Sequence, residues 1–415
     1  MSELQYSGAS RISRSAAYLL LGTVALVSGC RRSGFPDTPT GYREFAYVSN
    51  GKANTVSVLD LVYLRPDRTL QVGSEPSGMA VNPAKPEVYV VNSGNGGNGS
   101  VSVIDAVHNT VVATIPVHRQ PFAISVDSLG RRAYVANSGS NTVSVIDLDR
   151  RREIAIAGTG EQPGLARISQ DGRSLVVTNR GSGSVSIFTA APYASANDDK
   201  STQPLKLRAA FPNCPGATDA VILPDSSKAF IACSSGHQLM AINLAAAPDS
   251  WAAKQNPSLM SDSVLAMLDV GDTPIHLAMK PDGGELFVSN FAAGTISEIS
   301  TYTNEVGGTY PIGNHPVHGI VSSDNSTLWV SNFGADSLSL YSIDDGKLVS
   351  TLRTGSAPDV LAFSADEHLL LAADSHSGDV SVIRTQGKLG PALFTIMPSG
   401  PSPNDIVVKA LPSTN

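Results

Sequence analysis

The sequence has little of what usually marks a catalytic or nucleic-acid-binding protein. Its 415 residues include 3 cysteines, 6% aromatic and 16% charged residues. The absence of a Cys-x-x-Cys-His motif excludes covalent c-type haem, and neither a Gly-x-Ser-x-Gly elbow nor a phosphate-binding loop is present. The formal net charge is −7, and the repeats contain no stretch rich in Lys and Arg longer than the three arginines at 150–152. These absences exclude several enzyme classes and argue against a nucleic-acid partner.

What the sequence does have is a repeated tetrapeptide of two or three apolar residues closed by a polar one. Its closing positions, 42 to 57 residues apart, are Asn50, Asn92, Asn137, Asn179, Cys233, Asn290, Asn332 and Asp374. Around each copy the apolar residues alternate over short runs bounded by Gly, Pro, Asn and Asp, as in Thr142 to Ile146. Such runs predict short strands joined by tight turns. A period near 42 residues is typical of a β-propeller built from four-stranded blades.

These tetrapeptides resemble those of the YVTN-repeat propeller family, over residues 41 to 409. The first copy reads YVSN from Tyr47 to Asn50, and Trp329 to Asn332 reads WVSN. The chain has no Trp-Asp dipeptide and is therefore not of the WD40 type by sequence. The resemblance implies an all-β propeller and leaves its function open, because such propellers serve many roles.

Counting strands predicts eight blades in a ring closed by the two ends of the chain. The first copy, at Tyr47, is a second strand without a first strand before it, and Asn404 to Lys409 is a first strand without a second strand after it. Pairing the two completes one blade and removes a free sheet edge. Seven blades with an irregular insertion is the alternative, because the fourth and fifth repeats are long and degenerate.

The N-terminus reads as a bacterial lipoprotein signal. Arg11 and Arg14 precede an apolar segment at 16–27 that is short for a membrane span, and Val27 to Cys30 resembles a lipobox. That resemblance implies cleavage before Cys30 and attachment of a lipid to its thiol; an ordinary signal peptide is the alternative. We therefore expect a signal peptide over 1–29, a tether over 30–40, a propeller over 41–410 and a tail over 411–415.

The remaining cysteines, Cys214 and Cys233, lie at the fifth inner strand and at the end of its neighbour. Export to an oxidising compartment makes a disulfide possible. Counting across the hairpin places Cys233 nearer Thr218 than Cys214, so a bridge needs the preceding loop to fold back. A bridge and two inert thiols both remain open.

Candidate ligand-binding residues gather on one face of the predicted ring, at the entry to the inner strands. Gapless alignment of the repeats puts four polar residues at equivalent inner-strand positions. Three further candidates, one histidine and two phenylalanines, lie in the adjoining loops. They are Asp219, His276, His318 and Asp405, and then His315, Phe291 and Phe333. Imidazoles and carboxylates around a channel suit a metal such as zinc or copper, or general acid–base work. Because His276/His318 and Phe291/Phe333 are each one period apart, duplication of a blade explains them equally well, and we assign no metal, cofactor or catalytic residue from sequence.

The sequence thus favours an exported, lipid-anchored, monomeric propeller of the cell envelope, at the outer membrane. It would bind a protein, an envelope polymer or a small ligand, and membrane contact would come through Cys30. The alternative is an enzyme or a cofactor- or metal-binding propeller with a site at the channel mouth, similar to haem d1 proteins or to lactonases.

Overall fold

The computed structural model describes residues 38–190, 205–387 and 390–411. Contacts divide the chain into a short unit, Met1–Thr38, and a large one, Pro39–Asn415, which contains the predicted propeller. The predicted signal peptide, the lipidation site Cys30 and nearly all of the tether lie outside the described residues.

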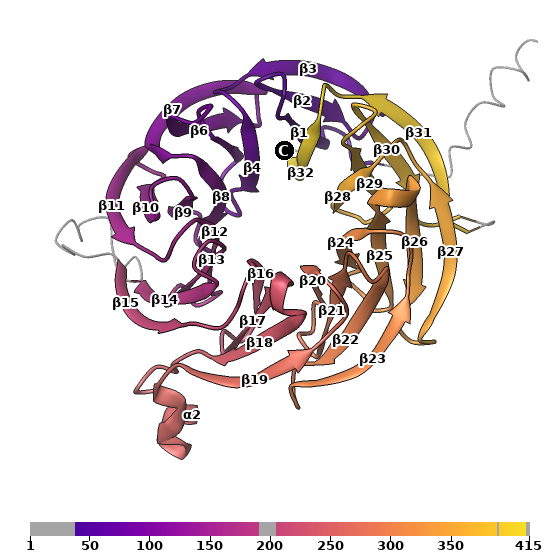
Figure 1. Cartoon of the computed structure of the whole chain (residues 1–415). Coiled ribbons are helices and arrows are strands. Elements are labelled where there is room, and N and C mark those ends of the chain that lie inside the picture. Colours follow the sequence, from indigo (N-terminus) through magenta and orange to yellow (C-terminus); the bar gives the residue numbers. More distant parts are fainter. Residues whose placement is uncertain (1–37, 191–204, 388–389, 412–415) are drawn as a thin grey trace, which may run out of the picture. The chain divides into compact units, whose positions relative to one another are not determined.

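Eight four-stranded antiparallel sheets form a closed ring, which confirms the eight-bladed propeller (Figure 1). The seven-bladed alternative is wrong. The long fourth and fifth repeats contain complete blades, and their extra residues lie between the third and fourth strands. Insertion at that connection leaves the pairing of the blade intact, since a hairpin loop can lengthen without disturbing its register.

Each blade has four strands, which are called the first to the fourth from the channel outward. The first strands are β4 (Pro76–Val81), β8 (Pro121–Val126), β12 (Pro163–Ile168), β16 (Ala217–Ile222), β20 (Pro274–Met279), β24 (Pro316–Val321), β28 (Pro358–Phe363) and β32 (Pro403–Leu411). The second strands are β1 (Arg43–Asn50), β5 (Glu87–Asn92), β9 (Arg132–Asn137), β13 (Ser174–Asn179), β17 (Lys228–Cys233), β21 (Glu285–Asn290), β25 (Thr327–Asn332) and β29 (Leu369–Asp374). The third strands are β2 (Thr55–Asp60), β6 (Asn98–Asp105), β10 (Thr142–Asp147), β14 (Ser184–Ala190), β18 (Gln238–Asn243), β22 (Thr295–Ser300), β26 (Ser337–Ser342) and β30 (Asp379–Arg384).

The outermost strands are β3 (Arg65–Gln71), β7 (Thr110–Arg119), β11 (Arg152–Gly158), β15 (Leu205–Phe211), β19 (Ser263–Asp269), β23 (Glu305–Pro311), β27 (Lys347–Arg353) and β31 (Ala392–Pro398). Helical structure in the described residues is confined to α2 (Trp251–Gln255) and the 3-10 turns η1 (Ser234–Gly236), η2 (Pro257–Met260) and η3 (Phe333–Ala335). None of these helices is long and apolar enough to cross a bilayer.

The core lies between neighbouring blades, which pack face to face. Second strands are covered on both sides, so all six residues of β9 and of β13 are buried. Outer strands cover only one side and alternate, as the exposed and part-buried residues of β7 show. Apolar clusters therefore combine residues of adjacent blades, such as Trp329 from β25 with Leu370 from β29. This arrangement follows from the period-2 pattern of apolar residues.

The repeated asparagine holds the second strand to the third. In the first blade the Nδ2 of Asn50 donates to the hydroxyls of Thr55 (3.1 Å) and Ser57 (2.9 Å). Asn290 makes the same bonds to its own Thr and Ser, five and seven residues further along. The buried amide donors of these asparagines are thereby satisfied at the end of the hairpin.

The chain ends close the ring as the strand count predicted. β32 pairs antiparallel with β1, from Arg43 opposite Leu411 to Asn50 opposite Pro403. The C-terminal strand also reaches the next blade, because the Nζ of Lys409 donates to the carbonyl of Asn82 (2.7 Å). The first blade is thus completed by a strand from the other end of the chain.

The fifth blade is tied by a disulfide between Cys214 and Cys233, whose Cα atoms are 4.7 Å apart. Both residues are fully buried among apolar side chains. Cys233 pairs with Ala217 across the hairpin, and a bulge between Ala217 and Ala220 accompanies the approach of the preceding loop. The loop therefore does fold back, which makes the bridge possible.

Candidate functional site

One face of the ring, here called the top face, is where the first strands begin and the second strands end. The two ends are adjacent because the strands are antiparallel: Pro274 at the start of β20 lies opposite Asn290 at the end of β21. Side chains of the first strands alternate between the channel and the blade interior. Residues near the start of each first strand thus surround the mouth of the central channel.

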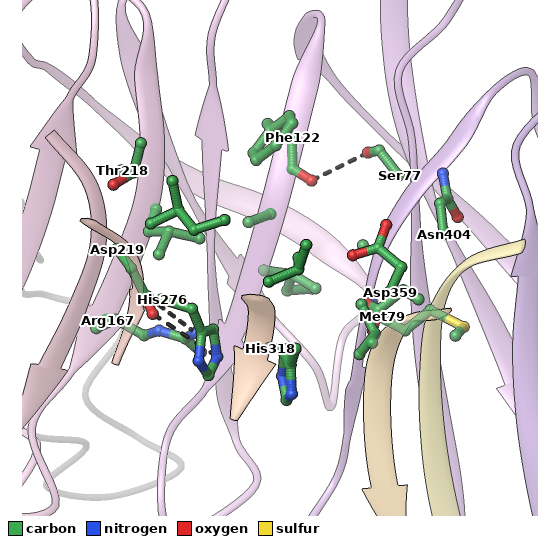
Figure 2. A pocket seen from close by; sticks show the side chains of 18 residues that line it. Ser77, Met79, Phe122, Arg167, Thr218, Asp219, His276, His318, Asp359 and Asn404 are labelled. Atoms are coloured by element: carbon green, nitrogen blue, oxygen red, sulfur yellow. Dashed lines mark hydrogen bonds and ion pairs between the residues drawn. The ribbon is translucent and has the colours of Figure 1, made fainter. Parts of the chain in front are cut away.

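The four aligned candidates, Asp219, His276, His318 and Asp405, all line one cavity of about 300 Å³ at this mouth (Figure 2). They come from β16, β20, β24 and β32. Ser77, Phe122, Leu165, Arg167, Thr218 and Asp359 line the same cavity. Repeat alignment had placed the four at equivalent positions, and ring closure brings them around one space.

The two aspartates also clasp neighbouring blades. Asp405 accepts hydrogen bonds from the backbone N–H groups of Met79 (2.6 Å) and Ile406 (2.8 Å), and Met79 lies on the first strand of the next blade. Asp219 does the same with Leu277 (2.9 Å) and Ala220 (2.8 Å). Their carboxylates therefore have a structural role whatever else they do.

The two histidines differ in which ring nitrogens have hydrogen-bond partners. The Nδ1 of His276 accepts from the backbone N–H of Gly319 (3.2 Å), and its Nε2 lies 3.8 Å from Asp219. The ring of His318 lies beside it, with centroids 4.0 Å apart. The Nδ1 of His318 is buried and has no hydrogen-bond partner in the described part of the chain. His318 thus has a ring nitrogen whose hydrogen-bonding capacity the described residues leave unused.

Burial and nearby charge shift the ionisable groups toward their neutral forms. Burial lowers the pKa of His276 to about 3, and it lowers the pKa of His318 well below its usual value. Burial raises the pKa of Asp405 to about 7 and that of Asp359 to about 6. At neutral pH both imidazoles are therefore uncharged.

Sequence reasoning missed Arg167, the cation of this cavity. Its guanidinium lies 3.8 Å from the carboxylate of Asp219 and its side chain is 47% exposed. Its charge lowers the pKa of both histidines and of Asp405, which places it electrostatically at the centre of the cavity. The signal was present, since Arg167 lies two residues after Leu165 and a strand turns such residues to the same side. Asp359, one position off the aligned set, lines the cavity as well.

The loop candidates His315, Phe291 and Phe333 are not among the residues that line this cavity. Phe291 stacks on His315, with ring centroids 4.4 Å apart, and Phe333 lies edge-on to His376 at 5.2 Å. Each of these phenylalanines thus pairs with a histidine on the loops around the mouth.

Within the described ranges, no three His, Cys, Asp or Glu side chains are grouped so as to hold a metal ion. The carboxylates of Asp219 and Asp405 are directed to backbone N–H groups, which leaves the expected donor set without a common centre.

Comparison with known proteins supports the fold. A family model described as "Lactonase, 7-bladed beta-propeller" matches residues 298–408, which is less than half of the chain. No curated protein matches the chain.

Three solved structures illustrate the likeness. The dihydro-heme d1 dehydrogenase NirN shares 14% identity with a TM-score of 0.67, over 91% of this chain and 77% of that one. The periplasmic gluconolactonase PpgL of Pseudomonas aeruginosa shares 18% identity with a TM-score of 0.57, over 89% and 99%. Hydrazine synthase of Kuenenia stuttgartiensis shares 19% identity with a TM-score of 0.51, over 71% and 91%. At these identities the likeness establishes a propeller fold alone.

Proposed function

We propose that the protein is a hydrolase of small cyclic esters, with its site in the cavity at the channel mouth. The observation that carries this is one solvent-connected cavity, lined by the imidazole of His318 and by the guanidinium of Arg167. The partial match to a lactonase model and the likeness to a gluconolactonase favour an enzyme of this kind over a pure scaffold.

The residues suit the two demands of ester hydrolysis. His318, kept neutral by burial, takes a proton from a water molecule, whose oxygen then attacks the carbonyl carbon of the ring. The negative charge that develops on the carbonyl oxygen is stabilised by Arg167. The ring C–O bond breaks, the leaving oxygen takes the proton from the imidazolium, and a hydroxy acid results. Atoms and charge balance without a cofactor.

The other residues of the cavity position this pair. His276 holds its place through Gly319 and packs against His318, so the two rings constrain each other. Asp219 and Asp405 fix the starts of adjacent first strands. The cavity volume of about 300 Å³ is at the small end of the range for ligand sites, which favours a compact ligand.

The test is turnover of a panel of lactones, read as acid release at constant pH. The panel includes glucono-δ-lactone, its 6-phosphate, and aliphatic γ- and δ-lactones. Wild-type protein should hydrolyse at least one faster than buffer, and His318→Ala should reduce kcat/KM by about 10²- to 10⁴-fold. If no lactone is hydrolysed, or if the variant is as active as the wild type, the proposal fails.

A tetrapyrrole ligand is the second candidate, favoured by the paired imidazoles of His276 and His318 and by the likeness to NirN. The small cavity counts against it. Titration with haemin distinguishes the two, because axial binding by His318 would shift the Soret band in wild-type protein and not in His318→Ala.

We also propose that the protein is exported and anchored to the cell envelope through a lipid on Cys30. The support is the lipobox-like run from Val27 to Cys30. A monomer that binds a protein or an envelope polymer remains the alternative to the enzyme; it would lose nothing when the channel-mouth residues are changed.

A further inference from the structure

Arg180 and Gly164 depart from the repeat together in the fourth blade. The residue directly after each second strand is small or aromatic elsewhere: Gly51, Ser93, Ser138, Ser234, Phe291, Phe333 and Ser375. In the fourth blade it is Arg180. The second residue of each first strand has a side chain in every other blade: Ser77, Phe122, Thr218, Ile275, Val317, Asp359 and Asn404. In the fourth blade it is Gly164.

The two departures fit each other. A Cβ atom at Gly164 would lie 3.0 Å from the Nε and 3.1 Å from the Cδ of Arg180, which is tighter than most Cβ contacts, so that the arginine would have to shift by a few tenths of an ångström. The missing side chain therefore makes room for the arginine to lie over the start of β12. Its guanidinium then rests on the ring of Phe122, with Cζ 4.2 Å from the ring centroid. Phe122 is one of the residues that line the cavity, so the guanidinium of Arg180 lies next to the cavity lining without being part of it.

The electrostatics of Arg180 are those of a charge without its usual partner. Burial lowers its pKa, and among the described residues no carboxylate forms an ion pair with it. Removing a charge from water is costly unless it is paired, and contact with a ring offsets only part of that cost. The chain has a net charge of −7. A half-buried arginine without an ion-pair partner in such a chain is suited to bind an anionic ligand.

We propose that Arg180, seated over Gly164 and Phe122, is an anion-recognition residue, and that the ligand of the channel mouth bears a carboxylate or phosphate group. The planar guanidinium binds either group through two parallel hydrogen bonds. Arg180 holds this group next to the cavity lining while the ester reaches Arg167 and His318 deeper in the cavity. That the ligand is a cyclic ester rests on the proposed function. That the ligand carries a negative charge rests on the geometry of Arg180.

A binding experiment tests this without any turnover. The melting temperature of wild-type protein is measured with increasing inorganic phosphate or gluconate, at constant ionic strength set by NaCl. The two anions separate phosphate from carboxylate recognition. Binding to the folded state raises the melting temperature with anion concentration, and calorimetric titration gives the dissociation constant.

Arg180→Gln should bind the anion at least 10-fold more weakly, and Arg180→Lys should fall between it and the wild type because the ammonium lacks the planar fork. Arg173→Gln is the matched control, since Arg173 directly precedes β13, at the end opposite Arg180; it should bind as the wild type does. The proposal is overturned if neither anion protects the wild type, or if Arg180→Gln binds equally well. Anion protection without lactone turnover would refute the hydrolase and leave this site standing.

Discussion

At the scale of single residues, departures from the repeat carry the special chemistry. Asp374 is such a departure, because it stands where six other blades have asparagine. Its Oδ2 accepts from the backbone N–H (3.0 Å) and hydroxyl (2.7 Å) of Ser381. Burial and the neighbouring Asp379 raise the pKa of Asp374 to about 7. One buried acid therefore has to hold a proton where the repeat has an amide.

This predicts that Asp374→Asn stabilises the protein at pH 8. The folded state binds the proton more tightly than the unfolded chain, whose aspartate has a pKa near 3.9. Stability is thus lost as pH rises from about 4 to about 7, and stays low above that. Asparagine has no proton to lose, so the Asp374→Asn variant should have a free energy of unfolding at pH 8 that is higher by up to about 4 kcal/mol.

Urea unfolding at pH 5 and pH 8 measures the effect. The gap between the two pH values should narrow in Asp374→Asn and be unchanged in Asp344→Asn, an aspartate on a surface turn. Equal pH dependence in Asp374→Asn and the wild type would contradict the account.

The candidate site could be predicted in part at this scale. Position in the repeat was enough to bring His276, His318, Asp219 and Asp405 to one cavity, because ring symmetry places equivalent residues around the same axis. What each side chain binds was not visible, since the clasps of Asp219 and Asp405 depend on backbone groups of the next blade. Alignment one position at a time also passed over Arg167, whose side chain points the same way from two residues further along.

At the scale of elements, the disulfide of the fifth blade should contribute measurably to stability. It closes a loop across 19 positions between Cys214 and Cys233. Restricting the unfolded chain over such a loop is worth about 3 kcal/mol. The double change Cys214→Ala/Cys233→Ala should lower the free energy of unfolding by about that amount, measured by urea titration.

Treatment of the wild type with reductant in urea should reproduce the loss, and the double variant should not respond to reductant. A wild type that unfolds identically with and without reductant would show that the two thiols are not joined. Sequence alone could not settle this pairing, because it depends on the path of the loop before Ala217.

At the scale of the whole molecule, eight blades could be predicted by counting strands, and closure by the unpaired strand at each end. The long insertions were the reason for the alternative of seven blades. They do not change the number of blades, because they lie between the third and fourth strands of a blade, which still pair with each other. Deleting residues 404 to 415 should therefore destabilise the entire ring. It removes most of β32, leaves the inner edge of β1 unpaired and uncovers apolar surface worth about 25 cal/mol per Å².

Thermal unfolding is the measurement for this deletion. We expect a melting temperature many degrees lower, or an aggregated product, since an open edge strand also invites pairing with other chains. Removal of 412–415 alone is the control and should change little. A 404–415 deletion that melts like the full chain would refute the closure.

Export and anchoring are tested on the intact precursor. Cys30→Ala should prevent lipid attachment, so that the product remains unprocessed or fails to partition into the detergent phase. Cys30 is the residue on which the lipobox resemblance depends. A variant that partitions as the wild type does would rule out the lipid anchor.

The central claim is that the channel mouth is a reactive site built around His318, and one comparison tests it most directly. Lactone hydrolysis is measured for wild type, His318→Ala and His108→Ala, with melting temperatures taken alongside. His108 is a histidine with 73% side-chain exposure, paired with Asp105 on a turn away from the mouth. The account predicts a 10²- to 10⁴-fold loss of kcat/KM, as an order-of-magnitude range, in His318→Ala alone, with its melting temperature nearly unchanged. Equal activity in all three proteins, or a loss that merely follows the melting temperature, would contradict it.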